Sequence, residues 1–293
     1  MIARPRDTPL AFAALALAGS IWGASFVLGK IALTELSVPH LLLYRFAFAS
    51  LAFLVLLFRM RVSLTRAEWG MVVVAAVLGV PIQFLLQFEG LARTTASHAA
   101  LMIGTAPVMV AIAGYFVFRE RLKAAAWFAL VASTAGVALI VMQAGGGADR
   151  ARPSLTGDLL VIASLVAAVV WILASKRLME RHSPVAVSGI ITLTGSVMLA
   201  AWVLARNGMP PTQLRAGTWV AIASLGVIAT TCSTALWNWG LAHTDAGRAG
   251  AFINLEPVIG AVLGVLVLHE SLGPTAVAGG ALIVAGALVV SRK

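Results

Sequence analysis

The chain has 293 residues, of which 60% are hydrophobic and 11% are charged, and its mean hydropathy is +0.98. Soluble domains carry about a quarter charged residues, so the composition excludes a water-soluble globule and predicts an integral membrane protein. The net charge of +10 does not indicate a nucleic-acid partner, because membrane proteins collect Lys and Arg in their cytoplasmic loops.

Ten apolar runs stand between short charged connections, and each has roughly the 20 residues that a helix needs to cross a bilayer. In chain order they are Leu10–Leu33, His40–Phe58, Trp69–Phe88, Ala96–Phe118, Ala124–Met142, Leu159–Ser175, Val185–Leu204, Thr218–Trp239, Ala249–Leu268 and Thr275–Val290. The predicted fold class is therefore all-α. We divide the chain into a first five-helix unit (residues 1–142), a linker (143–157) and a second five-helix unit (158–293).

The basic residues are divided unevenly between the two sides that these spans create. Of the 21 Lys and Arg residues, Arg45 lies within a span and most others lie on the side of both termini. The opposite side holds only Lys30, Arg93, Arg150, Arg152, Arg206 and Arg215. Because loops rich in Lys and Arg stay in the cytoplasm, we expect a multi-pass protein with both termini in the cytoplasm.

An internal repeat relates the two units. Displacing the chain by 150 residues aligns Gly90–Val141 with Gly240–Ser291 without a gap. The identical pairs include Gly90/Gly240, Pro107/Pro257, Gly114/Gly264, Glu120/Glu270, Leu122/Leu272 and Gly136/Gly286. An odd number of helices in each unit requires the second copy to be inverted in the membrane, and inverted repeats around a midplane site are typical of secondary transporters.

These features resemble a known family. The Ser-Ile-Trp-Gly segment at residues 20–23, Pro39 and Arg45 around the start of the second span, and the paired Pro, Gly and Glu-x-Leu positions of the repeat are similar to EamA-type members of the drug/metabolite transporter superfamily. The resemblance covers the whole chain, and within the family it is greatest to bacterial inner-membrane amino-acid exporters of the YddG kind. It implies export of small metabolites through a cavity between the units.

One position departs from a branch of that superfamily. The small multidrug exporters depend on a first-helix Glu three residues before a Gly, whereas Ser20 stands three residues before Gly23 here. This difference argues against a transporter that exchanges protons for cationic drugs.

Glu256 is the acidic side chain that the spans place near the bilayer midplane, where an unpaired carboxylate costs at least a few kcal/mol. Either it binds a substrate ammonium or carries a proton, or it stabilises the kink before Pro257. Asn254 lies roughly 160° away around a regular helix. Both can therefore line one cavity only where the backbone is distorted, and otherwise Asn254 bonds a neighbouring helix.

Pro107 and Pro257 occupy matching positions of the repeat, and each removes one helical hydrogen bond and kinks its helix. We predict a shared hinge for alternating access, or a carbonyl turned toward the cavity. Static curvature inherited with the fold is the alternative.

Aromatic and polar side chains complete the predicted substrate site. Trp22 and Ser25 share a face of the first span, Trp171 lies in the sixth span, and Gln83 and Gln87 share a face of the third. An aromatic wall suits an apolar substrate side chain, and a hydroxyl or amide suits its polar end. Packing or interhelical hydrogen bonding is the alternative for each of them.

Arg45, near the predicted outer end of the second span, binds a substrate carboxylate, snorkels to the surface, or pairs with Glu35 or Glu89. His98, near the outer end of the fourth span, is a candidate proton carrier or a rim residue. Tyr44 and Trp237 complete the predicted substrate-binding set.

Two further sets of residues receive structural interpretations. Glu120 and Glu270 lie at helix junctions, where a carboxylate favours the N-terminus of the next helix. The glycine pairs Gly19/Gly23 and Gly260/Gly264 pack helices within the chain or between chains.

Enzymatic chemistry has little support in the sequence. The five His residues show no metal-ligand spacing, and no Walker motif is present, so we expect no catalysis, metal site or cofactor. The predicted function is export of hydrophobic, aromatic or small neutral amino acids from a bacterial cell by alternating access, with the bilayer, the substrate and candidate coupling protons as partners. Broad efflux of drugs or amphiphiles is the alternative, and a channel or embedded enzyme is the alternative of another class.

Overall fold

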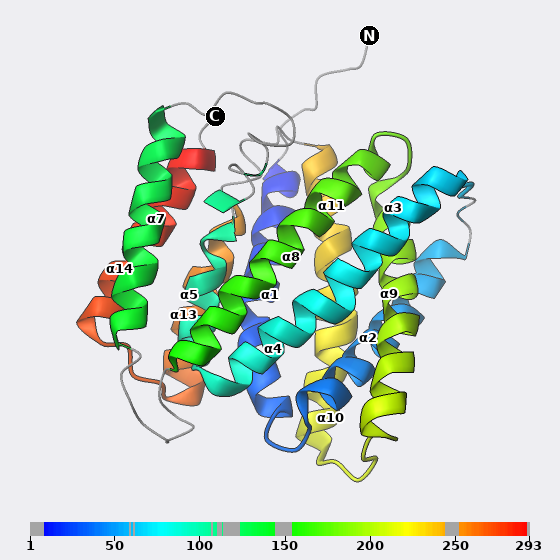
Figure 1. The fold of residues 1–293 in the computed structure, drawn as a ribbon, viewed down its shortest axis with the longest axis horizontal. Helices are drawn as coiled ribbons and strands as arrows, with labels where there is room; N and C mark the ends of the chain where they lie inside the picture. Colours follow the sequence, from blue (N-terminus) through cyan, green and yellow to red (C-terminus); the bar gives the residue numbers. More distant parts are fainter. Residues whose placement is uncertain are drawn as a thin grey trace.

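The computed structural model describes residues 9–58, 60, 62–106, 108–109, 113, 124–143, 154–243 and 252–291. Within these ranges the chain forms helices and no strand (Figure 1). The helices are α1 (Pro9–Ala32), α2 (Val38–Leu57), α3 (Arg66–Val77), η1 (Leu78–Ile82), α4 (Gln83–Arg93), α5 (Ala96–Ile103), α7 (Ala124–Gln143), α8 (Leu155–Met179), α9 (Pro184–Asn207), α10 (Ala216–Ala223), η2 (Ser224–Cys232), α11 (Ser233–Ala242), α13 (Leu255–Leu268) and α14 (Pro274–Ser291).

Each predicted span contains a helix. Six described helices are long and apolar enough to cross a membrane, namely Pro9–Ala32, Val38–Leu57, Arg66–Arg93, Leu155–Met179, Pro184–Asn207 and Ala216–Gly240. Shorter apolar helices cover Leu255–Leu268 and Pro274–Gly286. The number of ten crossings stays a prediction, because much of the fourth span and the start of the ninth lie outside the described residues.

The two ends of the bundle can be told apart in Figure 1. The first residues of α1 and the last residues of α14 lie at the upper end of the view. The α1–α2 turn, the end of α4 and the first residues of α8, α10 and α14 lie at the lower end. Under the predicted orientation, the lower end faces out of the cell.

Two long helices contain π-helical stretches. The helix formed by α3, η1 and α4 begins at Arg66, and the helix formed by α10, η2 and α11 begins 150 residues later at Ala216. In η1 the π-helical stretch includes Pro81, which cannot donate a backbone hydrogen bond. Such stretches often mark functional sites, and η2 contributes to the candidate site described below.

The breaks near the predicted hinges lie before the prolines. A turn at Gly104–Thr105 follows α5, and a turn at Asn254 precedes α13. Pro257 is the third residue of α13, where no helical hydrogen bond is lost because the first amides of a helix have no partner within it. The interruption at Asn254 is therefore the irregularity next to Pro257. Pro107 lies outside the described residues, and the hinge role of both prolines stays a prediction.

Glycines bring α1 and α13 into backbone contact. A Cβ atom added to Gly23 would lie 2.6 Å from the Glu256 carbonyl oxygen and 2.9 Å from the Gly260 nitrogen. An added Cβ on Gly19 would lie 2.5 Å from the Phe252 carbonyl oxygen. Close approach at small residues is a common way for membrane helices to associate, so these glycines serve packing within the chain.

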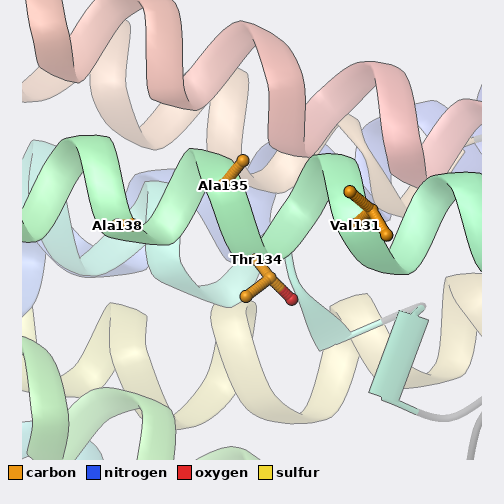
Figure 2. Close-up of a pocket in the computed structure, with 4 residues that line it drawn as sticks. All are labelled: Val131, Thr134, Ala135 and Ala138. Atoms are coloured by element: carbon orange, nitrogen blue, oxygen red, sulfur yellow. The ribbon is translucent and has the colours of Figure 1, made fainter.

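α7 and α14 form a second glycine-mediated pair, in which an added Cβ on Gly136 or Gly279 would lie 2.5 Å from the carbonyl oxygen of the other. A surface groove on α7 is lined by Val131, Thr134, Ala135 and Ala138 (Figure 2). Its lining carries no charged side chain, so it offers nothing to hold a charged substrate.

Gly23 provides a test of this packing. We expect Gly23→Ala to destabilise the protein by about 1–3 kcal/mol, because the new methyl group meets backbone atoms that cannot move aside. Thermal unfolding of the detergent-solubilised protein measures the effect. Gly217→Ala is the matched control, since nothing lies within 4 Å of its added Cβ; equal losses in the two variants would contradict the packing role.

Candidate functional site

Arg45 of α2 is buried among aromatic rings. Its side chain is 4% exposed, and its guanidinium carbon lies 4.5 Å from the ring centroid of Phe84 and 5.3 Å from that of Phe88. Cations are attracted to the faces of aromatic rings, and more strongly where water is excluded. Arg45 therefore stays inside the bundle and does not snorkel to the surface.

The two alternative partners considered for Arg45 are engaged elsewhere. The Glu35 carboxylate accepts from the Arg215 Nε at 3.0 Å and from the Arg215 backbone amide at 2.9 Å. Glu89 pairs with Arg93 on the exposed surface of α4. Neither carboxylate pairs with Arg45 in the described part of the chain.

The π-helical stretch η2 supplies a partner for Arg45. The Arg45 Nε donates to the Thr230 Oγ1 at 3.1 Å, and the Thr230 hydroxyl donates to the Leu225 carbonyl at 2.8 Å. An added Cβ on Gly226 would overlap the Arg45 carbonyl oxygen and lie 2.5 Å from the Phe48 Cβ. The missing side chain at Gly226 therefore lets η2 lie against the α2 backbone and brings Thr230 to the guanidinium.

Glu256 provides the opposite charge. It is the second residue of α13 and is half-buried, and a carboxylate in the first turn is favoured by the helix dipole. The charges of Arg45 and Glu256 interact electrostatically. Among the described residues no direct ion pair, with nitrogen and oxygen within 4.0 Å, joins them. The interior therefore holds a basic and an acidic side chain, separated by more than the length of an ion pair.

Aromatic rings contribute to this interior. The ring centroids of Trp22 on α1 and Trp237 on α11 lie 5.5 Å apart. The Ser25 hydroxyl donates to the Trp22 carbonyl at 2.6 Å, so its proton is used within α1. Trp171 lies against Gly79 of η1, where an added Cβ would be 2.6 Å from the indole. This contact is a packing contact, and a role of Trp171 in substrate binding stays a prediction.

Amide side chains add polar groups that are buried. The Oε1 atoms of Gln83 and Gln87 on α4 are buried and accept no hydrogen bond. A buried acceptor without a donor costs about 1–3 kcal/mol, so each is suited to receive a donor from a bound molecule or water. Asn254 is buried at the turn that precedes α13, two residues from Glu256.

Tyr44 and His98 lie in other environments. The Tyr44 hydroxyl donates to the Pro211 carbonyl at 3.1 Å, and its ring packs on Trp219 with centroids 5.0 Å apart. His98 is fully buried, so it is not a rim residue, and its Nδ1 lies 3.3 Å from the Asp158 carboxylate. We group Arg45, Thr230, Glu256, Trp22 and Trp237 as the candidate substrate site and call this group the Arg45–Glu256 site.

Glu270 caps a helix, but not the one expected. Its carboxylate accepts from the backbone amides of Ala96 and Ser97, at 2.7 and 2.8 Å, at the start of α5. The sequence led us to expect α14, the next helix in the chain. His269, with a φ of 55°, turns the chain at the end of α13 and precedes this cap. Glu120 lies outside the described residues.

Two important residues were not singled out from the sequence. Thr230 belongs to a polar run, Thr230–Thr234, inside an otherwise apolar span, and this run was the available signal. Asp158 stands at the start of a predicted span, a position that commonly holds a simple helix-capping carboxylate. Neither contact could be read from spacing, because each joins residues far apart in the chain.

Three relatives that are named as transporters match most of this chain. An uncharacterized transporter of Archaeoglobus fulgidus is 28% identical over 282 residues, which are 95% of this chain and 96% of that protein. The uncharacterized transporter YetK of Bacillus subtilis is 26% identical over 267 residues, 89% of this chain and 80% of that protein. The biotin transporter of Escherichia coli is 27% identical over 280 residues, 93% of this chain and 90% of that protein.

A solved crystal structure has the same fold, with a TM-score of 0.68 and 21% identity over 98% of both chains. The EamA-like transporter family matches residues 10–142 and 155–292. The apolar helices, the buried charges and this match, which covers most of the chain, lead to one conclusion: the protein belongs to the EamA-like transporter family and is a multi-pass membrane transporter.

Proposed function

We propose that this chain exports hydrophobic, aromatic or small neutral amino acids across a bacterial inner membrane by alternating access. The observation that supports the proposal is the buried guanidinium of Arg45 together with the acidic side chain of Glu256, which is near enough to act on it electrostatically. A zwitterion presents its carboxylate and ammonium with the matching polarity. A single cation or anion would use one of these two groups and leave the other without a partner, which is costly for a charged group in a membrane interior.

Each end of the zwitterion has a suitable group. The Arg45 guanidinium uses Nε for Thr230, which leaves its terminal nitrogens for a substrate carboxylate, and guanidinium groups bind carboxylates with two parallel hydrogen bonds. The Glu256 carboxylate accepts from the ammonium. Trp22 and Trp237 offer an aromatic surface to an apolar substrate side chain.

The position of the site also suits alternating access. Arg45 belongs to the predicted first unit, whereas Thr230 and Glu256 belong to the predicted second unit. A substrate between them contacts both units, so rocking one against the other changes its access without dismantling the site. The division into two inverted units and the cytoplasmic position of both termini are parts of this proposal.

A monocarboxylate is a second candidate substrate, because one relative is a biotin transporter and biotin carries a carboxylate but no ammonium. In that case Arg45 holds the carboxylate and Glu256 has no counterpart. The two candidates therefore differ in their dependence on Glu256.

The Glu256→Gln variant separates these candidates. In proteoliposomes we expect the wild type to exchange labelled neutral amino acids. The exchange rate of the variant should be at least tenfold lower, because an amide cannot neutralise an ammonium. Biotin exchange, if present, should survive. Glu180→Gln changes an exposed carboxylate and serves as the control.

Two outcomes would overturn the proposal. Full amino-acid exchange by Glu256→Gln would remove Glu256 from the site. Transport of lipophilic cations without any amino acid would favour broad amphiphile efflux instead.

Thr230→Val tests the positioning of Arg45. Loss of one hydrogen bond of about 1 kcal/mol should raise the KM for amino-acid exchange roughly fivefold. Thr234→Val is the matched control, because the Thr234 hydroxyl donates only to the Thr230 carbonyl of its own helix. An unchanged KM in Thr230→Val would show that Thr230 does not position the guanidinium.

A further inference from the structure

A second ionisable pair lies at the lower end of the bundle, apart from the Arg45–Glu256 site. The side chains of His98 on α5 and Asp158 on α8 are both 0% exposed, and the His98 Nδ1 lies 3.3 Å from the Asp158 Oδ2. Thr94, between α4 and α5, donates its hydroxyl to the Asp158 Oδ1 at 2.6 Å. The pair joins the predicted first and second units.

Close backbone packing keeps water away from this pair. An added Cβ on Gly90 would lie 2.7 Å from the Gly157 carbonyl oxygen, and one on Gly157 would lie 2.9 Å from the Thr94 Cβ. The end of α4 and the start of α8 therefore touch through glycines. A pair enclosed in this way can exchange protons with water only when α5 and α8 move apart.

The hydrogen-bonding pattern leaves one basic nitrogen unused. An ionised Asp158 carboxylate can only accept, so the His98 Nδ1 carries the shared hydrogen and the neutral ring keeps a lone pair on Nε2. That Nε2 is buried and has no hydrogen-bond partner. Protonation at Nε2 turns the hydrogen bond between a neutral imidazole and the Asp158 carboxylate into an ion pair, while the Nδ1 hydrogen stays in place.

Few other charges act on His98. His98 is in the first turn of α5, where the helix dipole disfavours a cation, but Glu270 caps the same turn and Lys30 of α1 interacts with Glu270. On α4 the exposed Glu89 and Arg93 pair with each other. Between Pro274 and Ser291, α14 has no titratable residue. On α13, Glu256 lies in the first turn and His269 follows the last residue. His269 is therefore next to Glu270, the residue that caps the turn containing His98.

We propose that His98 and Asp158 form a proton-binding site, and that its proton is exchanged when the lower end of the bundle opens. Imidazole is a common proton carrier in proteins, and the Nε2 of His98 is the position that takes up the proton. The closed lower end holds the proton between α5 and α8, and separation of the helices exposes Nε2 to water. Its coupling to transport rests on the proposed function, whereas proton binding itself does not.

Nuclear magnetic resonance tests proton binding without any substrate. In protein labelled with nitrogen-15 at histidine, the ring signals missing from His98→Gln identify His98. We expect these signals to report proton uptake at Nε2 when the pH is lowered in the wild type, and this uptake to change in Asp158→Asn, which keeps an acceptor for Thr94. A His98 ring that takes up no proton when the pH is lowered would overturn the proposal.

Transport measurements test the coupling. For one proton per substrate, a gradient of one pH unit supports up to about tenfold accumulation of the amino acid. We expect the wild type to show gradient-driven accumulation, and His98→Gln and Asp158→Asn to lose it while keeping amino-acid exchange without a gradient. His243→Gln is the control, because its ring is exposed and, in the described part of the chain, contacts Trp239 in the preceding turn of helix.

The outcomes separate the two proposals. Accumulation by both variants at the wild-type level would overturn the coupling role of the pair. If the wild type exchanges no amino acid, the proposed function fails, and the histidine titration still decides whether the proton site exists. If His98→Gln does not fold, the comparison of the wild type with Asp158→Asn decides in its place.

Discussion

The cost of an uncompensated charge inside a bilayer governs how this bundle is held together. Three charged side chains bind partners across the two predicted units: Arg45 reaches Thr230, Asp158 reaches Thr94 and His98, and Glu270 caps α5. Nearer the surface, Glu35 reaches Arg215 and Glu68 reaches His182 in the same manner. Removing one partner leaves a charge unpaired inside the bundle. The polar contacts therefore fix the arrangement of the two units more specifically than apolar packing can.

These contacts are distributed over both ends and the middle of the molecule. Glu35, Asp158 and Glu270 act at the lower end, and Glu68 with His182 acts at the upper end, where α3 meets the α8–α9 turn. Apolar contact alone discriminates weakly between helix arrangements in lipid, because the lipid tails are as apolar as leucine. An alternating-access cycle would therefore have to exchange polar contacts at one end for others, and glycine-lined interfaces such as Gly23 with Gly260 would stay closely packed.

The positions of the helices could be predicted from hydropathy, since each predicted span contains a helix in the described residues. Arg45 and Glu256 could be singled out because charged residues are rare within the spans. Thr230 and Asp158 could not, because their roles depend on a π-helical turn and on contacts between distant segments. The position of the helix break also differs from the expectation. Pro257 was expected to kink a continuous helix, but the break lies at Asn254 and Pro257 occupies the first turn of α13. The identity of the helix capped by Glu270 depended on tertiary packing in the same way.

The π-helical stretch η2 sets the rotation of α11 about the helix axis relative to α10. An α-helix turns about 100° per residue, so reverting a single π-turn to regular α-helix would rotate α11 against α10 by roughly that angle. Trp237 would then leave Trp22, and Thr230 would leave Arg45. The aromatic wall and the anchored guanidinium are therefore set by the same irregular turn, and a change in helical winding there would alter both sides of the Arg45–Glu256 site at once.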